Sequence, residues 1–363
     1  WLYSIICVYA LHPLFPIVSL YITKDGFFAY AFLLYFATIF DLLLTSGNAL
    51  KKLDFVVLHI LSIVFVCLTR HQGFYIVVLE SLLLLLYYRK QWYAVLYSTL
   101  PAILAVVLFN NVLLPRLDVE PSNKKEMYGM LFQQTAYYLT QHPDDVTKSE
   151  ICAIRGVMDP DMIVKKYQYN LVDDVKSCYV YTEKGEDQPD GMLHFRHVDH
   201  TGEKEALSAY RTAWFSMFLR HPVTYIEATC AVIGGFFYNV GPQIYYLDSN
   251  WDKSELATNS NFTFGHFDVF INFYNRYLSR ILALPLLSVL FSLPYYIWCT
   301  LLILGVLVCR LDMRGLALSL PIILSIGVLL LCPVATGRYE WPIIMCLPLL
   351  FVYAKQGNNF KNQ

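Results

Sequence analysis

Long apolar runs separated by short polar breaks dominate the sequence. The segment Val77 to Tyr88 (VVLESLLLLLYY) is apolar along nearly its whole length, whereas a barrel strand would alternate apolar and polar residues with a period of two. Runs of this kind are long enough to cross a hydrocarbon core of about 30 Å as helices. The pattern predicts an all-α polytopic membrane protein, and it excludes a soluble single-core fold and a transmembrane barrel.

Eight segments carry this pattern and are expected to span the membrane: residues 1–21, 26–46, 54–69, 72–88, 92–114, 288–309, 314–333 and 336–353. Two other segments are expected to contact the bilayer in a different way. Residues 222–240 are apolar enough to cross, although Glu227 and a Gly-Gly pair also suit an interfacial or re-entrant helix. Residues 276–287 have the pattern of a basic amphipathic helix lying at the interface.

Charge separates these spans from a hydrophilic region. Residues 116–215 hold 29 of the 55 charged side chains, although the whole chain is 57% hydrophobic and only 15% charged. Five parts follow from this division: residues 1–115 with about five spans, 116–221 as a hydrophilic domain, 222–287 as membrane-contacting segments with a loop, 288–353 with about three spans, and 354–363 as a tail. The net charge of −1 gives no broad basic field, so nucleic acid is not an expected partner.

Lysine and arginine in the short loops predict the orientation, because positive charges near span ends stay in the cytoplasm. Eight lie in one set of alternate loops: Lys51, Lys52, Arg89, Lys90, Arg310, Arg314, Lys355 and Lys361. Only Lys24, Arg70 and Arg338 lie in the other set. The protein is thus expected in the cell membrane as a multi-pass protein with residues 116–221 outside. This topology is self-consistent only if residues 222–240 do not cross the membrane, or if they cross it and residues 276–287 cross back.

The beginning of the chain and two cysteines add further expectations. Trp1 lies inside an apolar run without an initiator Met or a signal-peptide n-region, which indicates an N-terminally truncated piece of a longer protein. Cys152 and Cys178 both lie in the hydrophilic domain, where they could form a disulfide or remain as two reduced thiols. Thr147 and Glu150 have the spacing of a capping box at the start of a helix.

An acid opens the second span. Lys24-Asp25-Gly26 precedes the apolar run, so Asp25 lies at a helix N-terminus near the membrane surface. There it could accept the proton of an acceptor hydroxyl or hold a cation. A helix cap is the competing interpretation and is favoured about two to one by spacing alone.

Acids within the spans are also candidates for function. Asp41 and Glu80 lie in predicted spans, where a charged side chain costs about 2.5–3.5 kcal/mol on insertion scales. Asp41 is close enough to the cytoplasmic end to pair there, whereas Glu80 is near mid-span and needs a polar partner. A structural hydrogen bond between helices explains such an acid about as well as chemistry does.

Basic residues in the external loops could bind phosphate. Arg70-His71 joins two spans, and Arg338-Tyr339 lies in the last external loop. A guanidinium matches the geometry of phosphate oxygens, and these loops lie at the level of lipid headgroups. An interfacial belt of Arg and aromatic side chains is an equally good interpretation.

Two weaker patterns lie in polar segments. His194, His197 and His200 recur every three residues, but this spacing fits no common zinc pattern and favours a polar loop. Asn261 begins a formal glycosylation sequon.

The order of these parts resembles the polytopic glycosyltransferases of the GT-C class, and more closely a bacterial family of GT-C-like membrane proteins of unassigned function. The residues that carry this resemblance are the Lys-Asp before a span, TRHQGFYIVV from Thr69, FQQTAYYL at 132–139, YNLVDDVK at 169–176, HPVTYIEA at 221–228 and the Arg-Tyr-x-x-Pro of 338–342.

The resemblance implies an inverting transfer of a sugar from a polyprenyl-phosphate-linked donor to an extracytoplasmic glycan, lipid or protein acceptor. In GT-C enzymes the principal catalytic acid lies in a first external loop, which would precede Trp1. By similarity, Asp25 matches the assisting acid of the second loop, and Arg338 matches a basic residue that suits the donor phosphate. Lys24, Arg70, His71 and Tyr339 would belong to the same donor site. A divalent metal is used by some members of the class and not by others, so the cofactor stays open.

Two other functions fit the same sequence. A transporter or flippase of a lipid-linked intermediate would use Asp41 and Glu80 as pathway residues. A non-catalytic cell-surface assembly protein would use the hydrophilic domain to bind a partner.

Overall fold

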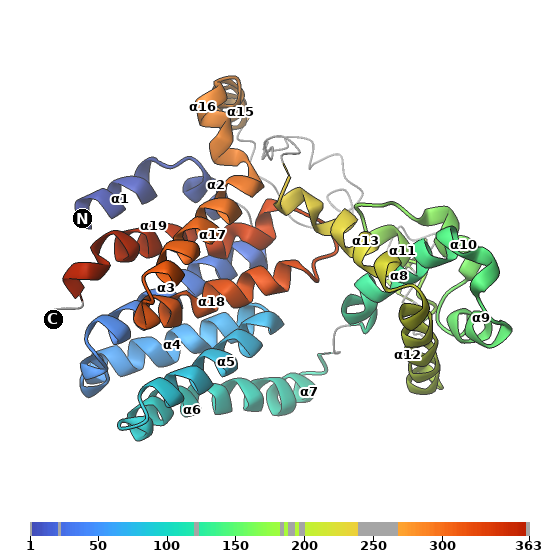
Figure 1. Ribbon diagram of the computed structural model, residues 1–363, viewed down its shortest axis with the longest axis horizontal. Helices are drawn as coiled ribbons and strands as arrows, with labels where there is room; N and C mark the ends of the chain where they lie inside the picture. The colour runs from blue at the N-terminus through green and yellow to red at the C-terminus, as the bar shows by residue number, and fades with distance from the viewer. Residues whose placement is uncertain are drawn as a thin grey trace.

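Helices make up most of the described residues, as the apolar pattern predicts. The computed structural model describes residues 2–20, 23–119, 123–181, 185–187, 193–195, 200–238 and 268–360. Two short strands, β1 (Gly185–Asp187) and β2 (Leu193–Phe195), pair as an antiparallel hairpin. Figure 1 shows a large helical bundle that contains both termini and a smaller helical domain beside one end of it.

The bundle is formed by helices from both ends of the chain. Its main members are α3 (Lys24–Leu44), α4 (Leu53–Thr69), α5 (His71–Tyr87), α6 (Trp92–Leu108), α17 (Leu293–Cys309), α18 (Met313–Leu329) and α19 (Gly337–Phe360). Helix α3 lies at the centre, where it packs against α4, α18 and α19. Its inward side is aromatic: Phe28, Phe32, Tyr35 and Phe36 are all at most 1% exposed. Burial of such side chains contributes about 1.5–3 kcal/mol each.

Several of these helices are suited to a membrane. Helix α3 and the continuous helical stretch Trp92–Arg116 are long and apolar enough to cross one, and a third span is possible if the bent pair Pro285–Phe291 and Leu293–Cys309 is counted as one. Helices α4, α5 and α18 are apolar but have 17 residues each. These findings indicate membrane association.

Most of the predicted spans match helices of the structure, but two of them differ in where the helix breaks or begins. The expected span over 1–21 is broken into α1 (Leu2–Leu11) and α2 (Leu14–Leu20), because Pro13 lacks an amide hydrogen and disfavours helix at His12. The expected span over 288–309 starts at Leu293 instead and bends by 78° from the preceding short helices. Those short helices are α16 (Pro285–Ser288) and η6 (Val289–Phe291).

The ambiguous segment 222–240 begins with a short helix of the small domain. Helix α13 (Pro222–Ile233) has 12 residues, so it is about 18 Å long and cannot cross the hydrocarbon core by itself. It packs against α8 (Lys125–Gln141), and its Tyr225 lies in the domain core. The last residues of this segment, 239–240, lie outside the described part of the chain.

The expected amphipathic helix over 276–287 begins earlier than predicted. Helix α15 (Asp268–Leu282) buries Leu278 and leaves Phe273 and Tyr277 more than half exposed. In Figure 1 it projects from the bundle together with α16. The exposed aromatic side chains agree with a helix at an apolar-polar boundary.

The small domain is helical and has its own core. Besides α8 and α13 it contains η3 (Pro143–Asp145), α9 (Lys148–Arg155), α10 (Pro160–Lys166), α11 (Asp173–Lys176) and α12 (Glu203–Arg220). The short helix η4 (Gly234–Phe236) follows α13 and packs against α17 of the bundle, where Phe236 is buried. The aromatic rings of Phe132, Tyr179 and Tyr210 pack together at the centre of the small domain and are at most 1% exposed. The predicted capping box is present, with Thr147 accepting from the Glu150 amide and Glu150 accepting from the Thr147 amide.

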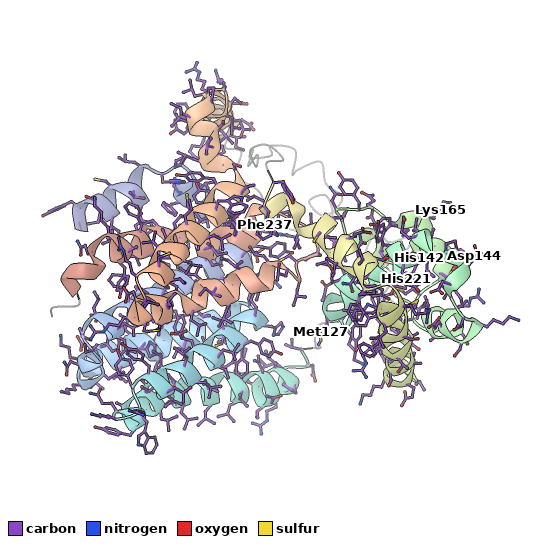
Figure 2. All side chains as sticks on the ribbon, in the orientation of Figure 1. Met127, His142, Asp144, Lys165, His221 and Phe237 are labelled. Atoms are coloured by element: carbon purple, nitrogen blue, oxygen red, sulfur yellow. The ribbon has the colours of Figure 1, made fainter. Side chains whose placement is uncertain are left out.

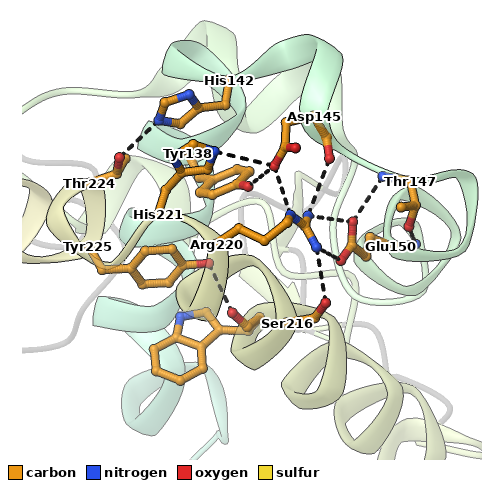
Figure 3. A network of polar contacts seen from close by, with 11 residues as sticks. Tyr138, His142, Asp145, Thr147, Glu150, Ser216, Arg220, His221, Thr224 and Tyr225 are labelled. Carbon is orange, nitrogen blue, oxygen red and sulfur yellow. Dashed lines mark hydrogen bonds and ion pairs between the residues drawn. The ribbon is translucent and has the colours of Figure 1, made fainter.

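Arg220, the last residue of α12, joins three elements of this domain (Figure 3). Its guanidinium donates to both carboxylate oxygens of Glu150, at 2.8 and 2.9 Å, and to Asp145 Oδ2 at 2.8 Å. Tyr138 also donates to Asp145, and Ser216 Oγ accepts from the guanidinium at 3.0 Å. Burial alone would raise the pKa of Glu150, but hydrogen bonds from Arg220 and from the Thr147 amide outweigh it and lower this pKa to about 2.

Replacing Arg220 by Ala leaves the buried Glu150 carboxylate without its cation. We expect the free energy of unfolding of the domain to fall by about 2 kcal/mol. Hydrogen exchange of the whole chain should show this as lower protection in α9 and α12. Arg155→Ala is the matched control, because Arg155 is exposed on α9, and unchanged protection in Arg220→Ala would contradict the role of this network.

Acid should have a similar effect on the domain. The low pKa of Glu150 means that its stabilising contribution is complete above its ordinary value of 4.5 and is lost as the pH falls through about 2. Protection factors in α9 should therefore decline between pH 4.5 and pH 2. The decline should be smaller in Glu150→Gln, and an equal decline in both proteins would contradict this assignment.

Candidate functional site

Three helices of the bundle begin close together, and their first residues form the candidate site. Asp25 lies in the first turn of α3, Arg70 directly precedes α5, and Arg338 lies in the first turn of α19. These residues come from distant parts of the chain, yet Asp25 contacts both arginines. The structure therefore brings together three of the residues that the sequence indicated.

The position of Arg70 is fixed by a tight helical hairpin. It is the single residue between α4 and α5, and its backbone is extended. Gly73 permits this close packing, because a Cβ atom there would lie 2.3 Å from the Val66 carbonyl oxygen. The arginine is consequently held at the tip of the hairpin, where its side chain reaches α3.

Asp25 and Arg70 form a buried ion pair. The side chain of Asp25 is 5% exposed and that of Arg70 is 13% exposed. Helix capping, the competing interpretation of Asp25, does not describe this contact, because Thr23 is the N-cap of α3 and the Asp25 carboxylate faces a guanidinium. Since ions lose hydration when buried, each of the two charges depends on the other.

Arg338 and Tyr339 complete the cluster. The Nε atom of Arg338 lies 4.0 Å from Asp25 Oδ2. Both guanidinium groups lie over the Tyr339 ring, with Cζ-to-centroid distances of 4.8 Å for Arg70 and 5.0 Å for Arg338. The Tyr339 hydroxyl also accepts a hydrogen bond of 3.2 Å from Arg338. Both cations thus gain a favourable contact with the same aromatic ring.

The electrostatics of this site favour an anion. Two guanidinium groups face one carboxylate, and three helix N-termini each add a partial positive charge. Arginines at helix N-termini are unfavourable unless an anion lies nearby. Asp25 supplies only one negative charge, and the Arg338 side chain remains 45% exposed. We infer that the cluster can accept one further anionic group.

Hydrogen-bonding groups beside the cluster are unsatisfied. The Nε atom of Arg70 and the hydroxyls of Thr23 and Thr336 are buried atoms without a hydrogen-bond partner among the described residues. Thr23 precedes α3 and Thr336 precedes α19 directly. Buried donors are nearly always paired in folded proteins, so several orphans at one place indicate a ligand or ordered water.

The small domain contacts the loop that leads to Arg338. The Val172 amide donates to the Pro333 carbonyl oxygen at 2.9 Å. Val172 also packs in a small cluster with Met130 and Val232, and all three are at most 7% exposed. This contact joins the domain to the segment that positions one arginine of the site.

Four predicted site residues lie outside the cluster. Lys24 and His71 are exposed, and neither has an ion pair or hydrogen bond to the cluster in the described part of the chain. Asp41 is exposed on α3, whereas Glu80 is fully buried on α5, and neither of its carboxylate oxygens has a hydrogen-bond partner in the part of the chain that the structure describes. No ion pair or hydrogen bond joins Asp41 to Glu80 among the residues described.

The remaining candidates of the small domain do not form a site. Cys152 is exposed and Cys178 is half-buried, and both thiols are free. His197 and Asn261 lie outside the described residues, while His200 lies 3.2 Å from Glu203 Oε2. Within the described ranges, no group of three or more His, Cys, Asp or Glu side chains is placed to hold a metal ion.

Sequence reasoning missed several parts of the site. Thr23 and Thr336 precede helices, which is a signal of an N-cap in the sequence. That their hydroxyls lack hydrogen-bond partners follows from the packing of the helices, which the sequence does not show. Phe28, one turn after Asp25, lies 6.0 Å from the Arg70 guanidinium. Glu340 is fully buried beside Tyr339, and an acid within an apolar run is a recognisable signal.

Removing the cation of the buried pair should be costly. We expect Arg70→Met to lower the free energy of unfolding of the detergent-purified chain by about 3 kcal/mol, because Asp25 stays buried without its partner. The double variant Asp25→Leu, Arg70→Met should recover most of this loss. Arg338→Met is the control and should change stability by less than about 1 kcal/mol, because its side chain is half exposed. Purely additive losses in the double variant would contradict the pairing.

Comparison with known proteins gives one family and no activity. No curated protein and no solved structure matches the chain. A family model described as a family of unknown function, DUF6020, matches residues 2–362. The described family carries no assigned chemistry, so the resemblance to GT-C enzymes remains an expectation. Because the match covers nearly the whole sequence, the chain belongs to the DUF6020 family.

Proposed function

We propose that this protein is a multi-pass membrane glycosyltransferase of the GT-C type. It transfers a sugar from a polyprenyl-phosphate-linked donor to an extracytoplasmic glycan, lipid or protein of the cell envelope. The observation that supports this proposal most directly is the meeting of Asp25, Arg70 and Arg338 at one end of the bundle. The two guanidinium groups suit the phosphate of the donor, and the acid suits the assisting role that the resemblance gives to Asp25.

The arginines match the leaving group of the reaction. The donor sugar is joined to a lipid phosphate, which departs as an anion, and guanidinium groups offset its growing charge. Arg338 is half exposed, so it is accessible to a ligand, whereas Arg70 is 13% exposed and paired with Asp25. The unsatisfied hydroxyls of Thr23 and Thr336 are further donors for phosphate oxygens.

The carboxylate matches the acceptor. An acceptor hydroxyl oxygen attacks the anomeric carbon as the bond from that carbon to the phosphate oxygen breaks, and the phosphate leaves with the bonding electrons. The hydroxyl proton passes to a carboxylate base. In this proposal Asp25 orients the acceptor hydroxyl and assists this proton transfer, as the acid of the second external loop does in GT-C enzymes.

The proposed topology places these groups on the outer face. Positive charges in the short loops predict that the α4–α5 connection and the α18–α19 connection are both external. The same rule predicts that the α5–α6 turn, with Arg89 and Lys90, is cytoplasmic. The domain at 116–221 then lies outside the cell membrane, where its Val172 bonds to Pro333 in the loop that leads to Arg338.

Transfer activity should depend on the cluster. In membranes that contain the full-length protein and a radiolabelled polyprenyl-phosphate sugar, we expect Asp25→Asn and Arg338→Ala to lower transfer by about 100-fold or more at equal protein levels. The matched controls are Asp54→Asn, in the first turn of α4, and Arg89→Ala, in the α5–α6 turn, and both should keep wild-type activity.

Three results would contradict this function or its site. If membranes with the wild-type protein consume no donor, the transfer function is wrong. Wild-type activity in both cluster variants would remove the site assignment. Loss of lipid-linked substrate movement in Asp41→Asn and Glu80→Gln, with transfer unaffected by cluster variants, would favour transport instead.

Topology can be tested with native cysteines. In a variant that keeps only Cys152 or only Cys309, both of which are exposed, a membrane-impermeant maleimide should label Cys152 from outside intact cells. Cys309 should react only after permeabilisation, because it lies next to Arg310 at the expected cytoplasmic end of α17. Labelling of both cysteines from the same side would contradict the proposed orientation.

A further inference from the structure

The small domain contains a pocket that the proposed transfer site does not use. It lies where α8 ends and α12 meets α13, and it has a volume of about 360 Å³. Figure 2 shows His142 and His221 here, on a part of the domain remote from the bundle. The pocket size is within the range of about 300–1,000 Å³ that is usual for small-molecule sites.

Two imidazole rings form one wall of this pocket. His142 and His221 stack with a centroid distance of 3.9 Å and an interplanar angle of 11°. His142 shares a hydrogen bond of 3.0 Å with Thr224, and the Nε2 atom of His221 lies 3.6 Å from Asp145 Oδ2. These contacts, drawn in Figure 3, hold both rings at the junction of the helices. Their orientation is consequently set by the fold.

The other polar groups of the pocket add both hydrogen-bond donors and acceptors. Gln141 is exposed at the end of α8 and offers an amide, and Glu227 offers a carboxylate that accepts a hydrogen bond of 3.3 Å from Tyr137. Imidazole, amide and hydroxyl groups together offer donors and acceptors within one small volume. A ligand rich in hydroxyl groups matches this mixture, because each hydroxyl also donates and accepts.

Charge argues against a phosphate ligand here. Arg220 lines the pocket, but its guanidinium is already bound by Asp145 and Glu150. Glu227 adds a negative charge that would repel an anion. This differs from the Asp25 cluster, where positive charge is in excess. The pocket therefore favours a ligand without an obligatory negative charge.

Apolar atoms complete the lining. Pro222 and Val223 lie at the start of α13, and Val223 is 63% exposed. Together with the imidazole faces they provide surfaces for C–H groups, whereas the polar groups match hydroxyls. A sugar ring has both kinds of surface, whereas an acyl chain would leave the polar groups without partners.

We propose that the pocket between the end of α8 and the start of α13 is a carbohydrate-binding site that holds a neutral part of a glycan. This site goes beyond the proposed transfer function, because it would bind a glycan even if the chain transferred no sugar. Helix α8 is about 25 Å long, so a glycan bound beyond its end is held away from the Asp25 cluster. A long acceptor chain could be retained there between successive reactions.

The test is a binding measurement on the whole chain. The purified full-length protein is applied to an array of immobilised oligosaccharides that contains neutral hexose, N-acetylhexosamine and uronic acid chains, and the affinity for the strongest neutral glycan is then measured in solution. We expect Val223→Trp, which fills the pocket, to weaken binding at least tenfold. Gln141→Ala should weaken it several-fold. Val164→Trp, an exposed valine on α10, is the matched control and should bind as the wild type does.

Binding and transfer are separated by a second set of variants. Asp25→Asn and Arg338→Ala should keep wild-type affinity for the glycan, so failure of the transfer proposal leaves this result intact. Three outcomes would overturn the carbohydrate site: no neutral oligosaccharide is retained, Val223→Trp binds as tightly as Val164→Trp, or retention is confined to negatively charged glycans.

Discussion

The buried ion pair of Asp25 and Arg70 is the constraint on which the proposed site depends. A carboxylate that is 5% exposed requires a compensating cation, and the α4–α5 hairpin supplies it from the single residue between two helices. Gly73 makes that hairpin possible, because any side chain there would meet the backbone of α4. With Asp25 neutralised by Arg70, the positive charge of Arg338 and of the helix N-termini remains available to a ligand.

Buried ion pairs between arginine and carboxylate side chains occur both in the small domain, where they stabilise the fold, and at the Asp25 cluster of the bundle. Arg220 pairs with both Asp145 and Glu150, which joins α12 to η3 and α9, and its positive charge is matched by these acids. At the Asp25 cluster the balance is different, since one acid faces two arginines. Charge balance therefore distinguishes a structural network from a group of residues that can bind an anion.

Local patterns in the sequence were enough to predict the helices but not most of their contacts. The apolar runs predicted α3 to α6 within a few residues, and Thr147 with Glu150 predicted the capping box, because both signals lie within one or two helical turns. The first apolar run was expected to be one helix, but Pro13 lies at the break between α1 and α2.

The site was indicated only in part, for a physical reason. Asp25, Arg70 and Arg338 could be selected as polar residues at span ends, but arginines near a membrane surface are also common as interfacial anchors. Only packing shows that these three meet, and that Lys24 and His71 do not join them. The unsatisfied Thr23 and Thr336 hydroxyls likewise become visible only when the helix ends are placed together.

The most direct test of the central claim is a cryo-electron microscopy structure of the full-length protein in a lipid nanodisc with a polyprenyl phosphate. The account predicts density for the phosphate within hydrogen-bonding distance of Arg338, with Arg70 and the Thr23 and Thr336 hydroxyls directed towards it. A phosphate bound elsewhere, with the cluster unchanged, would contradict the claim that these three helix N-termini form the donor site.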